Sequence, residues 1–210
     1  MLGTYDGHKK IGELREHGDF GLGTYDRLDG EMIALDGVFY QVKSDGTAYK
    51  AGDSVTTPFA VVTRFSADET TEVNGNIKCA GLKEALLELF PSRNIIYALK
   101  VSGEFSYLKT RSVPAQEKPY PLSEVVKNEA VFEFENLSGT IVGFWMPEYM
   151  KNLNQPGFHF HFISDDGKSG GHVLDCTVHE ASAGIDYLRD IDVSLPDTQS
   201  FNKAQLNRNP

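Results

Sequence analysis

The sequence predicts an α+β fold of two closely packed β-rich halves, with mixed or antiparallel sheets and few helices. Asp-Gly pairs between short alternating runs indicate hairpins. The clearest amphipathic helix lies between two strand-rich stretches and does not alternate with strands. The 210 residues are 40% hydrophobic and include 13 Phe, which is enough for a sizeable core. Because the helix does not alternate with strands, a doubly wound βαβ fold is not expected.

The chain begins with a predicted short helix and continues as a β-meander. Residues 8–17, HKKIGELREH, place Ile11 and Leu14 on one side, and Gly18 follows where a left-handed cap would lie. Because Asp-Gly supplies the positive φ of tight turns, three such pairs predict hairpins. They are Asp29-Gly30, Asp36-Gly37 and Asp45-Gly46.

A strand and the clearest helix follow the meander. VTTPFAVVTRF, at 55–65, reads as a strand in which Pro58 indicates an edge or a strand start. AGLKEALLELF, at 80–90, repeats apolar residues at i, i+3, i+4, i+7 and i+8, and Pro91 stops it. This spacing predicts an amphipathic helix.

The next stretch, residues 94–113, predicts two strands joined near Ser102 and Gly103. Alternation places four side chains on one face of the second strand: Phe105, Tyr107, Lys109 and Arg111.

The Pro-bearing stretch 114–122 is the candidate boundary between the halves, because Pro cannot continue a central strand. We expect an N-terminal half at residues 1–113 with one amphipathic helix, and a C-terminal half at residues 123–210. Four strand-like segments follow the boundary: VFEFEN, GTIVGFWMP, GFHFHFIS and GHVLDCTVHEASAGIDYL.

Charge and cysteine usage limit the possible partners. The chain has 20 basic and 30 acidic residues, and its net charge of −10 repels nucleic acid and anionic membranes, so neither is expected as a partner. Cys79 and Cys176 lie outside any C-x-x-C pattern and fit a reduced compartment better than a disulfide framework, although their pairing stays open. No apolar run approaches bilayer length, and the start has no export signal, so we expect a cytoplasmic protein.

Three of the six histidines lie in GFHFHFISDDGKSGGH, residues 157–172. Alternation in a strand points Phe158, Phe160 and Phe162 toward a core, and His159 and His161 toward the other face. The segment SDDGKSG predicts a turn, and if residue 163 faces residue 170, His161 faces His172.

Three imidazoles on one sheet face could hold a single ion with open positions for substrate or water, as in a catalytic zinc site. The C-terminal half is therefore expected to carry a metal site made of His159, His161 and His172. A lone inward histidine is more often a hydrogen-bonded core residue, and we assign such roles to His8, His17 and His179.

At this point the sequence resembles the α-acetolactate decarboxylase family, which converts 2-acetolactate to acetoin and carbon dioxide. The resemblance spans residues 11 to about 190 and rests on four blocks in the family's order: HGDFGLGTYDRLDGEMIALDG, TPFAVVTRF, TRSVPAQEKPYPL and GFHFHFISDDGKSGGHVLD. It implies that the three histidines hold zinc, or another divalent metal, and that Glu31 and Arg111 line the site with Thr24 near them. It also implies a glutamate from a C-terminal segment, and the chain up to Pro210 contains no match.

The residues themselves agree with these roles. Glu31 is more often a solvated hairpin carboxylate, but here it lies in an apolar run, DGEMIALDG, where it needs a partner. Arg111 could equally be a structural strand residue, but its planar fork suits a substrate carboxylate.

The implied reaction is metal-dependent decarboxylation, in which the metal chelates the ketone and hydroxyl oxygens and stabilises an enediolate. Glu31 then delivers the proton and Arg111 orients the carboxylate, and these two roles could be exchanged. Two alternatives stay open. One is a cupin-like iron dioxygenase, since H-x-H is followed four residues later by Asp165. The other is a non-catalytic, metal-stabilised binding module. A homodimer is also expected.

Overall fold

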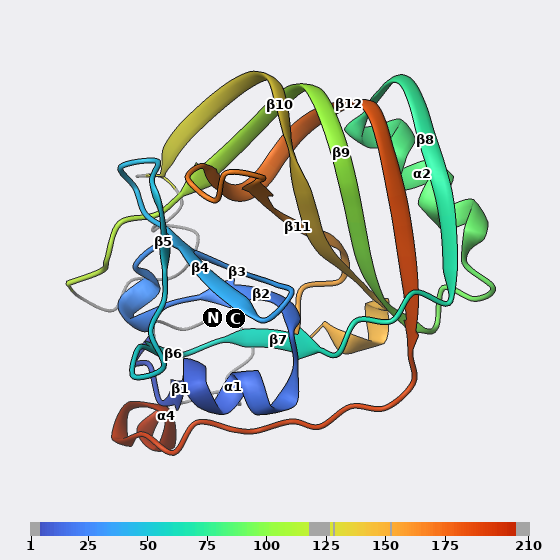
Figure 1. Ribbon diagram of the computed structural model, residues 1–210. Coiled ribbons are helices and arrows are strands. Elements are labelled where there is room, and N and C mark those ends of the chain that lie inside the picture. Colours follow the sequence, from blue (N-terminus) through green and yellow to red (C-terminus); the bar gives the residue numbers. More distant parts are fainter. Residues whose placement is uncertain (1–4, 118–126, 128, 152, 205–210) are drawn as a thin grey trace.

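Two five-stranded sheets pack face to face in the computed structural model, which describes residues 5–117, 127, 129–151 and 153–204 (Figure 1). Every strand pairing in these ranges is antiparallel. The predicted α+β class is therefore confirmed. No helix in the described ranges is long and apolar enough to span a membrane.

The smaller sheet is the predicted meander, in the order β5-β4-β3-β2-β7. Asp36 and Gly37 have φ of 50° and 77°, as the tight β3–β4 turn requires. The strands are β2 (Phe20–Thr24), β3 (Glu31–Leu35), β4 (Val38–Val42), β5 (Ala48–Lys50) and β7 (Ala60–Thr63). Around this sheet lie β1 (Lys9–Lys10) paired with β6 (Thr56–Thr57), helix α1 (Ile11–His17) and the 3-10 turn η1 (Asp26–Leu28).

The larger sheet curves over the smaller one in the order β11-β10-β9-β12-β8, and β11 also pairs with the start of β12 (Figure 1). Its strands are β8 (Glu69–Lys78), β9 (Ile96–Ser112), β10 (Ala130–Met146), β11 (Gly157–Ser164) and β12 (Gly170–Leu188). The sheet takes strands from both ranges of the predicted division, and residues 118–122 of the predicted boundary lie outside the described residues. The 3-10 turn η3 (Glu148–Met150) follows β10.

Two predicted breaks are wrong, because β9 and β10 are each one continuous strand. Gly103 pairs with Gly139 and Ala181, and a Cβ there would lie 2.2 Å from the Glu180 carbonyl oxygen. The glycine therefore reflects a close approach of β12, not a turn. In β10, the segments VFEFEN and GTIVGFWMP run on through Asn136, whose φ is +52°.

The predicted face of the second strand also needs correction. Tyr107 pairs with Thr177 but Phe105 pairs with Val178, so Ser106 is an extra residue, and alternation shifts there. Phe105 consequently shares the buried core with Leu108 and does not lie with Tyr107.

Gly18 ends α1, but its φ of −171° is extended and not left-handed. A Cβ at this position would lie 2.5 Å from the Thr63 carbonyl oxygen, so the close approach of β7 requires the glycine.

Helix α2 (Cys79–Leu89) confirms the predicted amphipathic helix, and it buries Leu82 and Leu86 in the core of the larger sheet. Its first residue, Cys79, forms a disulfide with Cys176 of β12. The expectation that a reduced state suits these cysteines better is therefore wrong for this structure. Lys78 pairs with Thr177, and this register brings together two cysteines that are 97 positions apart.

Phenylalanine rings of β11 pack against glycines of β10. Phe160 and Phe162 are buried in the core of the larger sheet, as predicted, and Phe158 is partly buried against it. A Cβ at Gly143 would lie 2.3 Å from Phe160, and one at Gly139 would lie 2.4 Å from Phe162. The two glycines therefore make the room that the rings occupy.

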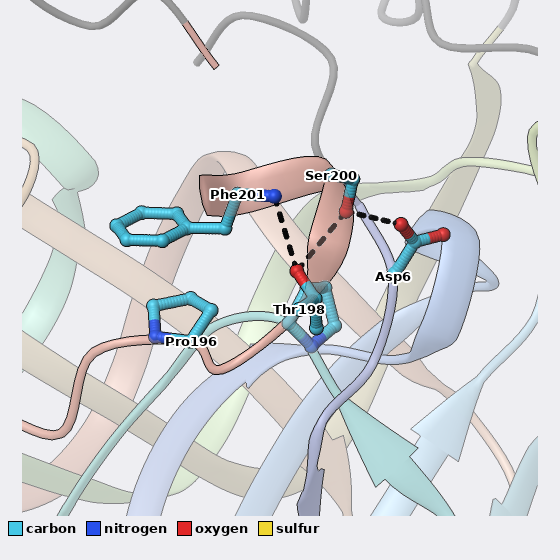
Figure 2. A pocket seen from close by; sticks show the side chains of 6 residues that line it. Asp6, Pro196, Thr198, Ser200 and Phe201 are labelled. Carbon is cyan, nitrogen blue, oxygen red and sulfur yellow. Dashed lines mark hydrogen bonds between the residues drawn. The ribbon is translucent and has the colours of Figure 1, made fainter. Parts of the chain in front are cut away.

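The C-terminal segment leaves β12, runs below the smaller sheet in the view of Figure 1 and ends in α4 (Gln199–Lys203). Thr198 caps α4 by accepting a hydrogen bond from the Phe201 amide, and the Ser200 hydroxyl donates to Asp6 (Figure 2). The pocket beside them has a volume of about 10 Å³, room for about one water molecule. It is too small for an organic substrate.

Candidate metal centre

The β11–β12 hairpin positions the three clustered histidines. Its turn is closed by hydrogen bonds from the Ser164 hydroxyl to Asp166 (2.7 Å) and from the Ser164 amide to the Ser169 carbonyl (2.9 Å). Gly167 supplies the positive φ of 67° that the turn needs. His161 pairs with His172 and Ile163 with Gly170. The register predicted from the sequence is confirmed.

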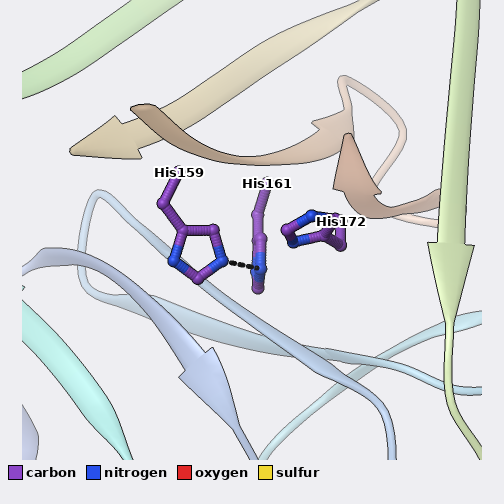
Figure 3. A group of neighbouring side chains, drawn as sticks. All are labelled: His159, His161 and His172. Carbon is purple, nitrogen blue, oxygen red and sulfur yellow. Dashed lines mark hydrogen bonds between the residues drawn. The ribbon is translucent and has the colours of Figure 1, made fainter. Parts of the chain in front are cut away.

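The three imidazoles face one another between the two sheets (Figure 3). Their ring centroids are 4.9 to 5.2 Å apart, and one nitrogen from each lies within 4.8 Å of the others. The Nε2 atoms of His159 and His161 are 3.1 Å apart. Such spacing suits three nitrogens that share one ion.

The protonation states also suit a cation. His161 Nδ1 donates to the Met32 carbonyl oxygen (2.8 Å), because a carbonyl can only accept, and this leaves the Nε2 lone pair facing His159. Burial, reinforced by the positive charge of Arg111, lowers the pKa of His159 to about 4. Burial likewise holds the pKa values of His161 and His172 well below the ordinary range. All three imidazoles are therefore neutral near pH 7, the form that binds a divalent metal.

Glu31 is brought to the cluster by the smaller sheet. It is the first residue of β3, and its Oε2 lies 3.5 Å from His161 Nε2. Burial raises the pKa of the Glu31 carboxyl to about 7; the charge of Arg111 opposes this rise and that of Glu129 adds to it. A substantial fraction of this side chain is therefore protonated near neutral pH.

Thr24 lies beside Glu31 because β2 and β3 pair these two residues. Its buried hydroxyl donates to the Gly30 carbonyl oxygen (2.8 Å), which fixes the backbone immediately before Glu31. In the described contacts its hydroxyl therefore supports the hairpin that carries the carboxyl group.

Arg111 joins the site from β9, where it pairs with His172. Its Nη1 donates to Glu129 Oε2 (2.7 Å), and its buried Nε has no hydrogen-bond partner among the described residues. Glu129 was missed by the sequence reasoning. The only signal for it is its position two residues before Val131, which pairs with Arg111.

The remaining histidines and Asp165 lie apart from this centre. Within the described ranges, one group of three or more histidine, cysteine or carboxylate side chains lies close enough together to hold a metal, and it consists of the three clustered histidines. His179 is exposed and contacts Asn76, and His17 is exposed as well, so the core roles predicted for these two histidines are wrong. Asp165 is exposed in the β11–β12 turn, so the ligand set of the dioxygenase alternative is not assembled.

Comparisons with known proteins show the family of the chain. The sequence profile of the alpha-acetolactate decarboxylase family matches residues 1–208. The chain is 49% identical over its whole length to the alpha-acetolactate decarboxylase of Methanosarcina mazei, of which it covers 73%. It is 42% identical to the Bacillus licheniformis enzyme, with 98% of this chain and 82% of that protein aligned.

Solved structures indicate the same family. The crystal structure of the Bacillus subtilis alpha-acetolactate decarboxylase superposes with a TM-score of 0.95 at 39% identity, covering 98% of this chain and 88% of that one. A Staphylococcus aureus protein described as similar to alpha-acetolactate decarboxylase superposes with a TM-score of 0.94 at 30% identity, covering 98% and 89%. Neither the dioxygenase nor the binding-module alternative is favoured by these matches. The chain belongs to the alpha-acetolactate decarboxylase family and is a carboxy-lyase that forms acetoin from 2-acetolactate.

Proposed function

We propose that decarboxylation takes place between the two sheets, at the point where His159, His161 and His172 meet Glu31 and Arg111. The observation that carries this proposal is the convergence of three neutral imidazoles, a buried carboxyl group and a guanidinium on one small region. Each of these groups has a separate task in the reaction.

The three histidines hold a divalent ion, for which zinc is the proposed identity because three imidazoles with an open position are typical of catalytic zinc. When bound, such an ion supplies Lewis-acid chemistry that polarises the ketone and hydroxyl oxygens of the substrate. The bond from His161 Nδ1 to Met32 fixes the orientation of the central imidazole.

Arg111 binds the substrate carboxylate. Its planar guanidinium can donate two parallel hydrogen bonds to a carboxylate, and it lies next to His172 in the sheet. Holding the carboxylate there keeps the bond that breaks close to the metal centre until carbon dioxide leaves.

Glu31 delivers a proton to the carbon that has lost carbon dioxide. Its burial in β3 excludes bulk water from this step and favours protonation from one side. Thr24 keeps this hairpin in place through its bond to Gly30. The tasks of Glu31 and Arg111 could be exchanged, and the Glu31→Gln variant tests whether Glu31 is the residue that delivers the proton.

The decisive experiment compares wild type with Glu31→Gln on racemic acetolactate under nitrogen, measuring carbon dioxide, acetoin and the chirality of the acetoin. Wild type should work without oxygen and yield mainly one enantiomer. The variant should retain metal but turn over roughly 100- to 10,000-fold more slowly, with a less enantiopure product. A fully active and stereoselective variant would remove Glu31 from the proton path.

Assembly as a homodimer is also proposed. Three exposed apolar side chains at alternate positions after β12, namely Ile191, Val193 and Leu195, support it because they offer apolar surface for a contact. Sedimentation at several protein concentrations tests this proposal, and a monomer at every concentration would refute it.

The cytoplasmic location predicted from the sequence is a proposal that the Cys79–Cys176 bond opposes, since disulfides persist mainly in oxidising compartments. Trapping thiols with an alkylating reagent at the moment of cell lysis decides it. Alkylation of both cysteines would support a cytoplasmic location, whereas a protein in which neither cysteine is alkylated would support an oxidising compartment.

A further inference from the structure

Glu129 makes a contact in the site that the decarboxylation scheme does not use. Its Oε2 accepts a hydrogen bond from Arg111 Nη1 at 2.7 Å. Both side chains are mostly buried, with 22% and 23% of their surface exposed. A charged hydrogen bond of this length that is partly shielded from water restrains a long side chain strongly.

A second ion pair, between β9 and β10, provides a comparison. Lys109 of β9 pairs with Glu133 of β10 at 2.9 Å, but these side chains are 35% and 56% exposed. Exposed pairs of this kind contribute little to stability or order. The Arg111–Glu129 pair differs because both of its side chains are less exposed, and because Arg111 pairs with His172 in the sheet.

The contact leaves one side of the guanidinium available. Glu129 bonds Nη1, whereas Nε is buried and has no hydrogen-bond partner within the described part of the chain. A buried donor without an acceptor costs free energy unless a ligand satisfies it. The Nε side of an arginine is also one of the two edges that bind a carboxylate through parallel hydrogen bonds.

We propose that Glu129 is a positioning residue, which holds Nη1 of Arg111 so that the Nε side of the guanidinium receives the substrate carboxylate. This inference rests on the carboxylate-binding role proposed above for Arg111. Glu129 also offsets the cost of burying the guanidinium before the substrate binds. It does not contact the reacting atoms in this scheme.

The test is steady-state kinetics on the metal-loaded enzyme with Glu129→Ala, Glu129→Gln, Arg111→Ala and the double variant Arg111→Ala/Glu129→Ala. Glu133→Ala is the matched control, because it removes an exposed carboxylate from β10, the strand that begins one residue after Glu129. Metal content and melting temperature are measured for each protein. The control should keep the kcat and KM of wild type.

We expect Glu129→Ala to lose roughly 10- to 100-fold in kcat/KM, since a hydrogen bond to a charged group is worth about 1.5–3 kcal/mol and each 1.4 kcal/mol is tenfold. The loss should fall mainly on KM, with metal content unchanged. Glu129→Gln keeps an acceptor and should lose less. In the Arg111→Ala background, removing Glu129 should cause no further loss.

Three results would overturn the inference. Wild-type kinetics in Glu129→Ala would show that Arg111 needs no anchor. Equal losses from Glu129→Ala in both backgrounds would give Glu129 a task independent of Arg111. Wild-type kinetics in Arg111→Ala would instead refute the role proposed for Arg111, and this inference with it. If Glu129→Ala does not fold, Glu129→Gln in the two backgrounds decides the question by the same comparison.

Discussion

Reduction of the Cys79–Cys176 disulfide should lower the stability of the protein more than any single surface change. The bond closes a loop across 97 positions of sequence. In the chain-entropy treatment, a loop of this size restricts the unfolded chain by about 4.7 kcal/mol at 25 °C. Since 1 kcal/mol shifts the melting temperature by about 2–4 °C in a domain of this size, complete loss corresponds to roughly 10–20 °C.

The assay is urea unfolding of the same protein with and without a phosphine reductant, which breaks the bond without changing the packed side chains. Both cysteines are buried beside Leu82 and Leu86, so the two thiols should still fill the core after reduction. The reduced protein should unfold at lower urea with a larger m-value, because its unfolded chain exposes more surface. Identical midpoints, with reduction verified by mass, would refute the reasoning.

Three further predictions follow from the site and the core. Changing any one of the three clustered histidines, His159, His161 or His172, to Ala should abolish bound metal and activity while the fold persists. His179→Ala is the control and should keep its metal. Full metal occupancy in a variant of the cluster would contradict the shared site. Arg111→Lys keeps the charge but removes the fork, so kcat/KM should fall with metal content unchanged, and equal kinetics would place Arg111 outside the site. Burial raises the pKa of Asp186. The stability that this carboxyl group contributes to folding is therefore present below the ordinary Asp pKa and is lost as pH rises through the raised pKa. The melting temperature of Asp186→Asn relative to wild type should increase from pH 4 to pH 7, and a constant difference would contradict this.

The structural features that were predicted best from the sequence are those determined by residues close together in the chain. The register of His161 against His172 follows from a short turn whose glycine and Ser164 are close by in the chain. The meander and α2 were predicted for the same reason, since their Asp-Gly pairs and apolar repeat are local signals.

The features that sequence reasoning missed depend on partners far away in the chain. Gly103 has the composition of a turn, and only the approach of β12 explains why the strand continues through it. The pairing of Cys79 with Cys176 follows from the β8–β12 register, which no local pattern encodes. Glu129 carries no motif, because its role comes from Arg111 on another strand.

The packing of Phe160 against Gly143 helps to fix the position of β11, the strand that carries His159 and His161 on its opposite face. Phe160 lies between His159 and His161 in β11, so a shift of the strand backbone at Phe160 would also move the two neighbouring imidazoles. A methyl group at Gly143 would lie 2.3 Å from that ring, closer than packed carbon atoms tolerate. Metal selectivity depends on the separation and geometry of the donor atoms. We therefore expect a larger side chain at Gly143 of β10, which is not one of the three histidines, to change the spacing of the donor nitrogens and with it the preference for one ion over another.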